Sequence, residues 1–509
     1  MSVVQSLLSQ ADTFQGPEIQ WWSLSPLLVL VGGALLLMLA GALTPKWPNG
    51  LYALAAVVVF AVAGGLAGML WWDITQDGAE TLVAGAVAFD AFSMATVAIL
   101  TQIGLLVALI AHDYLKGTPN DGPEIYALLL VAVAGGTVMA SANDLIVLFL
   151  GLETFSLALY VLAAMDRTRR GSQEAGMKYF VLGGFSSAFF LYGIALVYGA
   201  TGSTNIGEMV ESMQTGVDVE AGDALALAGV ALMLVGLGFK IAAVPFHSWA
   251  PDVYQGAPTP MTAFMASAGK IAAIMAILRV LVIALPFYKD DWRPALWVLA
   301  VLTLLGGSIL AVVQTDVKRM LAYSSIAHAG FLLVGVVAAG RGAGELDPGA
   351  GMPEIFVYVY LYDILVIGSF AVVYLVERSS GGDTDLDAFD GLSRRRPLLA
   401  LGFTVLLLAQ AGIPFTSGFV AKFAVISAAV SEEFYVLSVI AMVAAVIAAF
   451  LYLRIMIRMW LTDASDESKI PIPFATGFVV ALTVLGSLFY GLDPEPLLDA
   501  ADSVLEFAR

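Results

Sequence analysis

Residues 234–278 read LVGLGFKIAAVPFHSWAPDVYQGAPTPMTAFMASAGKIAAIMAIL and contain two long apolar runs, with Lys240 in the first and Lys270 in the second. A lysine at the centre of a membrane helix costs about 2.5 to 3.5 kcal/mol, so such a side chain is expected to face a polar cavity or a partner. Pro245 follows Lys240 by five residues, removes a backbone donor and crowds the preceding turn. Because unpaired carbonyls are tolerated in a membrane only where the backbone lines a polar space, the stretch predicts a broken membrane helix beside buried lysines.

The composition indicates a polytopic membrane protein. The 509 residues are 60% hydrophobic and 13% charged, and their mean hydropathy is +0.89. About 20 apolar residues in a helix cross a bilayer core about 30 Å thick. Runs of that length predict an all-α fold of about 14 transmembrane helices, at 26–43, 50–72, 88–111, 123–141, 143–164, 176–200, 224–246, 258–285, 294–313, 320–340, 353–376, 396–426, 434–461 and 470–492. A porin-like barrel would show short alternating strands instead.

A second helix break is predicted in the twelfth span, where Pro414 and Phe415 echo Pro245 and Phe246. Transporters use broken helices in pairs, one in each half of an internal repeat. Two breaks five spans apart predict two five-helix repeats, helices 4–8 and 9–13, and an odd number of helices makes successive repeats inverted. The predicted divisions are 1–122 (helices 1–3), 123–285 (first repeat), 286–462 (second repeat) and 463–509 (last helix and acidic C-terminal tail).

The basic residues predict the orientation of the chain. The even-numbered connections between spans hold only Lys289, Arg293 and Arg341, whereas the odd-numbered connections and the end of the thirteenth span hold Lys46, Lys116, Arg167, Arg169, Arg170, Lys318, Arg319, Arg378, Arg394, Arg395, Arg396, Arg454, Arg458 and Lys469. Cytoplasmic connections are enriched in lysine and arginine. The odd connections are therefore predicted to be cytoplasmic and both termini to lie on the opposite side.

Charges inside the predicted spans are the candidates for function. Lys240, Lys270 and Lys422 have apolar sequence on both sides, which favours a polar cavity. Lys178 lies near a helix end, where snorkelling to the interface and a functional role both stay open, and Arg279 is expected to snorkel.

Two acidic residues lie centrally as well. Glu153 is near the middle of the fifth span, where a carboxylate is expected to be protonated or paired. Asp363 is equally central in the eleventh span, and a hydrogen-bonded structural aspartate and a proton site both stay open.

No cofactor or metal site is expected in this chain. It has no cysteine, which excludes disulfides, thiolate-bound iron-sulfur clusters and thiolate zinc sites. The three histidines, His112, His247 and His328, are scattered in sequence. The net charge of −18 falls mostly in loops and the tail, so nucleic acid is not expected as a partner.

Four stretches, FKIAAVPFHSWAPDVYQGAPTPMTAFMASAGK, LFLGLETFSLALYVL, DVKRMLAYSSIAHAGF and GIPFTSGFVAKF, resemble the subunit N family of bacterial NADH:quinone oxidoreductase, respiratory complex I, over about 89–460. The resemblance implies an antiporter-like membrane subunit that relays protons, driven by quinone reduction in partner subunits. It implies a bacterial inner (cell) membrane location, neighbouring complex I membrane subunits as partners, and FMN, iron-sulfur clusters and quinone in other chains.

The resemblance also assigns residues. It makes Glu153 the carboxylate of the fifth helix and Lys178 its partner, and it makes Lys240, Lys270 and Lys422 the lysines of the first break, the eighth helix and the second break. His247 and His328 would extend the polar axis. Two alternatives stay open: a subunit of a multisubunit cation/proton antiporter on the same fold, and a purely structural membrane subunit whose lysines hold helices together.

Overall fold

The computed structural model describes residues 19–44, 47, 50–118, 120–215, 222–339, 351–463, 468–505 and 507–508. Within these residues, thirteen helices are long and apolar enough to cross a membrane. They are formed by α2 (Ser25–Leu43), α3 (Leu51–Asp77), α4 (Ala91–Leu115), α5 (Pro123–Ser141), α6 (Leu145–Ala163), α7 (Arg170–Thr201), α9 (Gly222–Lys240), α11 (Thr259–Ile277) with η1 (Leu278–Ala284), η2 (Pro286–Tyr288) with α12 (Lys289–Val312), α13 (Val317–Ala339), α14 (Met352–Ser379), α18 (Tyr435–Leu461) and α19 (Phe474–Leu492). The predicted all-α polytopic fold is confirmed.

The predicted twelfth span consists of two shorter apolar helices, α16 (Pro397–Ala411) and α17 (Ser417–Ser431). The thirteen long helices and this pair occupy the fourteen predicted positions. Shorter elements that the sequence analysis did not anticipate are a hairpin of β1 (Glu80–Leu82) and β2 (Val87–Phe89), α8 (Ile206–Thr215), α10 (Trp249–Gly256), η3 (Leu386–Phe389), α15 (Leu392–Arg395), α20 (Glu495–Asp502) and η4 (Ser503–Leu505).

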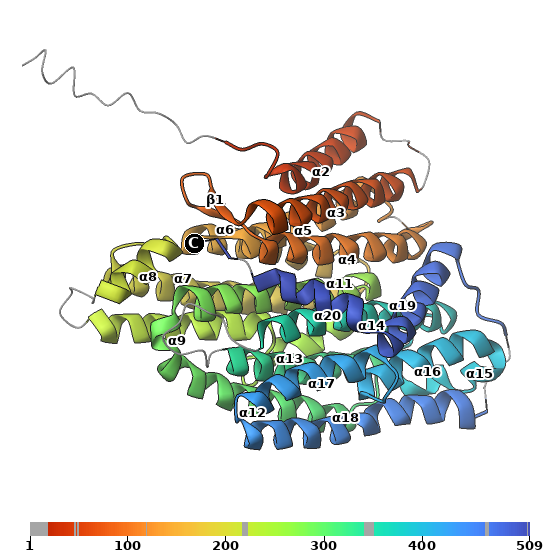
Figure 1. The fold of residues 1–509 in the computed structure, drawn as a ribbon. Coiled ribbons are helices and arrows are strands. Elements are labelled where there is room, and N and C mark those ends of the chain that lie inside the picture. The colour runs from red at the N-terminus through yellow and green to blue at the C-terminus, as the bar shows by residue number, and fades with distance from the viewer. Residues whose placement is uncertain are drawn as a thin grey trace, which may run out of the picture.

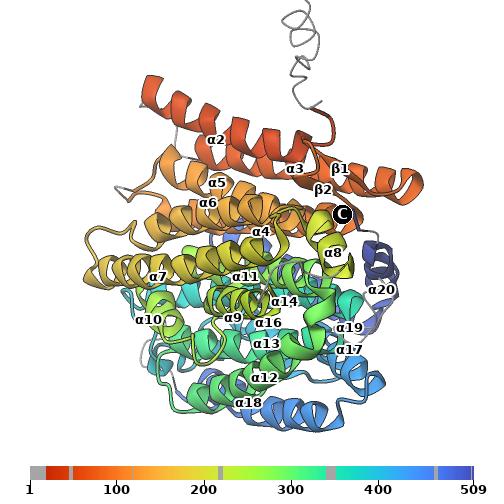
Figure 2. The same ribbon diagram turned by 90° about the vertical axis from the view of Figure 1, so that its left-hand side faces the viewer.

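The helices form a layered array (Figure 1). In Figure 1 and in the turned view of Figure 2, α2 and α3 lie at one end of the array and α12 and α18 at the other. Nearly every residue in α11, α13 and α14 is buried, whereas α2, α3 and α19 expose most of their surface. Side chains on the three central helices are therefore shielded from lipid on all sides.

The first predicted break follows α9. The N–H of Ala243 bonds the carbonyl of Gly238 at 2.8 Å, and the N–H of Ala242 bonds that of Phe239 at 3.0 Å. Ala242 has φ +58°, so the chain leaves the helix through a left-handed residue, as in a Schellman motif. The helix thus ends at Lys240, five residues before Pro245, which lies inside the break instead of terminating the helix.

The second break follows α16 in the same way. Gly412, at φ +88°, is the left-handed residue, and the N–H of Ile413 bonds the carbonyl of Leu408 at 3.1 Å. Pro414 again lies within the break, three residues after the helix ends at Ala411. The two predicted breaks are present, but left-handed C-caps end the helices, not the prolines.

The odd-numbered connections meet on one side of the array. Arg169, after α6, bonds Glu377 at the end of α14, and Asp113 of α4 accepts hydrogen bonds from the backbone and hydroxyl of Thr476. Asp316, after α12, forms a β-bridge with Asp385, after α14, and so adds a further odd connection. The membrane side on which they lie, the two inverted repeats and the domain boundaries stay predictions; Lys46 and Arg341 lie outside the described residues.

Candidate functional site

Lys240 lies against α6 at the end of α9. Its Nζ donates to the Ser156 hydroxyl at 2.6 Å and to the Tyr160 hydroxyl at 3.3 Å, and the side chain is 8% exposed. Glu153 lies one turn before Ser156 on the same helix and accepts a hydrogen bond from Ser187 of α7. Residues three apart share a helix face. Glu153 and Lys240 therefore belong to one polar cluster, in which the Ser156 and Tyr160 hydroxyls contact the ammonium.

Lys270 and Lys422 satisfy the backbone at the two helix breaks. Lys270 donates to the carbonyl of Ile241 at 2.8 Å, next to Lys240 in the chain. Lys422 donates to the carbonyls of Gln410 at 2.7 Å and Ala411 at 3.0 Å. The last carbonyls of a helix have no partner within it. Each ammonium thus stabilises a break that would otherwise leave acceptors unpaired inside the membrane.

His328 of α13 lies between the lysines in a network of hydroxyl groups. Its Nδ1 is 2.6 Å from the Tyr358 hydroxyl and its Nε2 is 3.4 Å from the Tyr452 hydroxyl. Tyr452 bonds Ser324 at 2.6 Å, and Ser324 donates to the side chain of Gln410 at 3.3 Å. Since the Gln410 carbonyl binds Lys422, these contacts connect His328 to the second break.

The network also reaches the helix that carries Lys270. Ser325, beside Ser324 on α13, is 2.8 Å from the hydroxyl of Tyr362. That hydroxyl donates to the carbonyl of Ala266 at 3.0 Å, one turn before Lys270 on α11. The polar residues therefore run from α11 through α13 and α14 to α16 and α17.

Lys178 does not form the expected pair with Glu153 in this structure. Its ammonium forms ion pairs of 2.7 Å with Glu174 and with Asp252 of α10, and its side chain is 39% exposed. Asp252 also binds Arg319 at 2.6 Å. The carboxylate of Asp252 in the short helix α10 thus holds the Lys178 ammonium at the half-exposed edge of the array instead of beside Glu153.

His247 lies in the first break and is half-buried. Its ring is 6.4 Å from that of Tyr323 on α13, and its buried Nδ1 has no hydrogen-bond partner within the described residues. His247 therefore lies next to α13 through Tyr323, and within the described residues it makes no hydrogen bond to the three lysines.

The expectation that Arg279 snorkels is wrong. Its side chain is fully buried, Nη2 pairs with Asp90 at 2.7 Å, and Nε donates to the carbonyl of Ala140 at 2.9 Å. The second Asp90 oxygen accepts the N–H of Ala508 at 3.2 Å. Arg279 lies in the π-helical η1 that ends the α11 span, and its planar head suits a buried carboxylate.

A buried charge cluster that was not predicted from the sequence lies on the side of the odd connections. Glu377 is 4% exposed and accepts hydrogen bonds from Arg169 and from the hydroxyl of Thr259. Lys318, 1% exposed, lies 4.0 Å from Glu377 and donates to the carbonyl of Ala257 at 2.8 Å. The sequence predicts only that Lys318 lies in a connection between two spans, and it does not predict burial of Lys318 or Glu377. Helix packing, which the sequence does not display, is what buries them.

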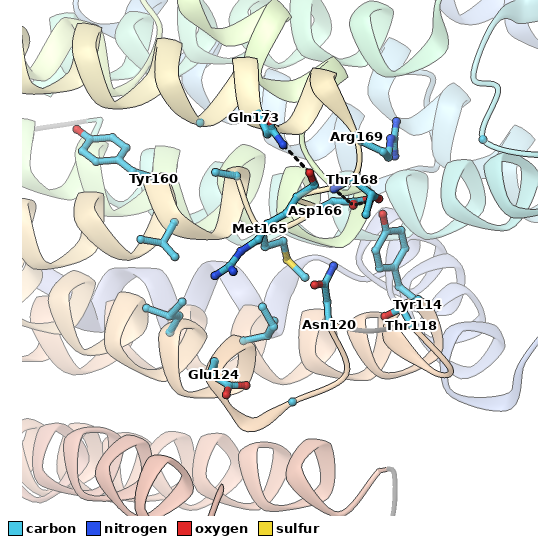
Figure 3. A pocket seen from close by; sticks show the side chains of 18 of the residues that line it. Tyr114, Thr118, Asn120, Glu124, Tyr160, Met165, Asp166, Thr168, Arg169 and Gln173 are labelled. Atoms are coloured by element: carbon cyan, nitrogen blue, oxygen red, sulfur yellow. Dashed lines mark hydrogen bonds between the residues drawn. The ribbon is translucent and has the colours of Figure 1, made fainter. Parts of the chain in front are cut away.

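A cavity of about 1280 Å³ opens on the side of the odd connections. It is lined by the α4–α5 connection, α5, the end of α6, α7 and the end of α14, including Glu377. In Figure 3, Asp166, Thr168 and Arg169 form a polar group, and Tyr160 lies apart from them at the other end. The cavity thus reaches from a polar surface to Tyr160, whose hydroxyl accepts a hydrogen bond from Lys240.

The structure offers no grouping suited to a metal ion within the ranges it describes: three or more histidine, cysteine, aspartate or glutamate side chains do not come together there. The site is instead a row of buried ammonium groups, carboxylates, hydroxyls and one imidazole. Side chains of these kinds are able to accept and donate protons.

Fold and site together define an antiporter-like membrane subunit. A family model described as "NADH:quinone oxidoreductase/Mrp antiporter, TM" matches residues 142–448, more than half of the chain. NADH-quinone oxidoreductase subunit N of Rhodococcus opacus (strain B4) is 40% identical over 100% of both chains. The protein therefore belongs to the NADH-quinone oxidoreductase subunit N family, as the four motifs predict.

Two solved structures agree with this assignment. A chain of "Respiratory complex I from Thermus thermophilus with bound Aureothin" is 31% identical with a TM-score of 0.76, covering 94% of this chain and 100% of that one. A chain of the Mrp complex from Dietzia sp. DQ12-45-1b has a TM-score of 0.82 at 21% identity, covering 96% of this chain and 97% of that one, and shares the fold alone. Full-length identity to subunit N disfavours the antiporter alternative.

Proposed function

We propose that this chain translocates protons across the membrane as a subunit of NADH-quinone oxidoreductase. One observation carries the proposal: Lys240, Lys270 and Lys422 are all buried in the helical array, and each donates to polar groups of the axis. Buried lysines in a membrane are costly and mark ion pathways when they line a polar interior.

The arrangement suits proton transfer between neighbouring groups. Hydroxyl groups both donate and accept hydrogen bonds, so Ser156 and Tyr160 can bind Lys240 in either charge state. Glu153 lies on the same face of α6 as Ser156, one turn from the hydroxyl that binds Lys240. A proton on one lysine disfavours a proton on the next, so the row titrates as a coupled set.

The cavity that ends at Tyr160 supports proton access to Lys240 from the side of the odd connections, which we propose is cytoplasmic. Both termini would then lie on the non-cytoplasmic side of a bacterial inner membrane. The remaining connection, from Lys270 through Tyr362 and His328 to Lys422, would carry protons along the array.

Energy for this transport would come from partner subunits. The chain has no cysteine to hold an iron-sulfur cluster, and we propose that FMN, the clusters and quinone are bound by other chains. Neighbouring membrane subunits would cover lateral apolar faces, such as the exposed Leu150, Leu157 and Phe185 beside Glu153.

The test compares Glu153→Ala, Lys240→Ala and the double variant in assembled complexes. Quinone-linked NADH oxidation and membrane acidification are measured together. We expect both singles to impair pumping and their effects on the logarithm of the rate to be non-additive, because each group changes the proton affinity of the other. Arg293→Ala is the control, since its ion pair with Asp290 is at the exposed start of α12.

Wild-type pumping by both single variants, or simple additivity, would refute the proposed coupling. Normal pumping with defective assembly in Lys240→Ala would favour the structural alternative. Sodium-dependent transport by the reconstituted wild-type complex would favour the antiporter alternative.

A further inference from the structure

Asp363 is a titratable group that the lysine row does not use. It lies in the middle of α14 and is fully buried, and both carboxyl oxygens lack a hydrogen-bond partner within the described part of the chain. The neighbouring N–H of Ile364 belongs to the hydrogen-bond ladder of the helix. A buried carboxylate without a partner is far more costly than the neutral acid.

Asp363 points away from the polar axis. Tyr358 and Tyr362 on one face of α14 contact His328 and Ser325 of α13. The face that carries Asp363 also carries Phe356, Tyr360 and Tyr374, which contact Trp71 of α3, Tyr490 of α19 and Tyr114 of α4. This face therefore packs against the N-terminal helices and α19.

Neither oxygen of the Asp363 carboxyl has a hydrogen-bond partner, charged or neutral, among the described residues. The tyrosines on this face include Tyr360 and Tyr374, and the hydroxyl of Tyr360 is 3.3 Å from that of Tyr490 on α19. Arg378, with Asp113 of α4, lies on this face 15 residues further along, which is about 22 Å at 1.5 Å per residue. On α11 and α17, the ammonium groups of Lys270 and Lys422 are directed to the helix breaks.

We propose that Asp363 is a second proton-binding site of this subunit, separate from the lysine row, which holds a proton in this conformation and releases it when α14 shifts during turnover. On release, the carboxyl O–H gives its proton to the Tyr360 hydroxyl, which passes its own proton to Tyr490. The half-buried Tyr490 hydroxyl passes a proton to water, so that Asp363 is left as a carboxylate and both tyrosines stay neutral. The second half of this proposal rests on the proposed proton-translocating function.

α14 supplies the link between the two sites. Its Tyr358 hydroxyl bonds His328 and its Tyr362 hydroxyl donates to the carbonyl of Ala266, while Asp363 lies on the same helix and packs against other neighbours. Any displacement of α14 that follows a changed hydrogen bond at His328 therefore also changes the surroundings of Asp363.

The experiment is infrared spectroscopy of the assembled complex. The wild-type spectrum should contain the carbonyl stretch of a protonated carboxylic acid that is lost in Asp363→Asn and shifted in Asp363→Glu. Asp144→Asn is the control: Asp144 caps α6 by accepting N–H bonds from Ile146 and Val147, and asparagine is an equally good cap. That variant should leave the acid band unchanged.

A second measurement tests proton release. On addition of NADH and quinone, the band should change in wild type and not in Asp363→Asn. If the resting Asp363→Asn complex loses a carboxylate band and keeps the acid band, Asp363 is ionised and the proposed proton-binding site is refuted. If Asp363→Asn does not assemble, an acid band that Asp363→Glu leaves unshifted refutes the site instead. A band that stays constant through turnover would overturn proton release. The resting spectrum does not depend on pumping, so failure of the proposed function is separately visible in the acidification assay.

Discussion

The ion pair of Arg279 and Asp90 allows a sharp test of the packing between η1 and the start of α4. Both side chains are fully buried and 2.7 Å apart. Arg279→Met removes the guanidinium and leaves a buried carboxylate with only the N–H groups of Ser93 and Ala508 as partners. Breaking a buried pair by removing one member costs about 3 to 5 kcal/mol. Arg279→Lys keeps the charge but loses the bond to Ala140, which is worth about 1 to 2 kcal/mol.

The assay uses the absence of cysteine in the chain. With Ala508→Cys as the background, a maleimide reports whether the C-terminal residues stay packed against Asp90, since Ala508 is buried. We expect fast labelling and reduced thermal stability of the assembled complex in Arg279→Met, and intermediate values in Arg279→Lys.

A double-mutant cycle provides the control. Asp90→Asn keeps a good helix cap for α4 and its contact with Ser93, so it removes mainly the charge. Arg279→Met combined with Asp90→Asn should be less destabilised than the sum of the single variants. Additive losses, or slow labelling in Arg279→Met, would refute the view that the pair holds the C-terminal residues.

Three further outcomes follow from the helix breaks and the first lysine. Gly412→Ala should destabilise the complex by about 1 to 2 kcal/mol and reduce acidification, because φ is +88° and a Cβ would lie 3.0 Å from Lys422 Cδ. Ala242→Gly, at φ +58°, should be neutral or stabilising. A higher melting temperature for Gly412→Ala than for Ala242→Gly would contradict the left-handed caps. Lys422→Ala should reduce acidification per NADH oxidised in assembled complexes, whereas unchanged pumping would make Lys422 structural. Ser156→Ala removes a 2.6 Å charge-assisted bond to Lys240, worth about 1.5 to 3 kcal/mol, and should slow pumping several-fold; wild-type rates would exclude that contact from the relay.

The positions of the helices were predictable because long apolar runs have one stable solution in a bilayer. The breaks were predictable from Pro245 and Pro414, but their exact ends were not, since Ala242 and Gly412 end the helices through backbone conformations that involve neighbouring carbonyls. Alanine carries no signal for a left-handed cap. Gly412 does carry that signal, and it could have been read from its position before Ile413 and Pro414.

Partners of the candidate residues were less predictable than the residues themselves. Burial of Lys240, Lys270 and Lys422 follows from their apolar surroundings, and all three are buried. The choice of Asp252 by Lys178, and of Asp90 by Arg279, depends on contacts across 74 and 189 residues of sequence. The hydroxyls of Ser156 and Tyr160 could have been identified, since they follow Glu153 at helical spacing.

The carbonyl contacts of Lys422 have a consequence for how the second break behaves when its charge changes. A protonated lysine has three N–H bonds, of which the Gln410 and Ala411 carbonyls engage two. The neutral amine keeps two N–H bonds and gains a lone pair. Both carbonyls can therefore remain bonded after a proton leaves, and the lone pair stands where that proton was. Discharging and recharging Lys422 requires no unwinding of α16, so the proton can leave and return on the timescale of hydrogen-bond rearrangement, without waiting for a helix to move.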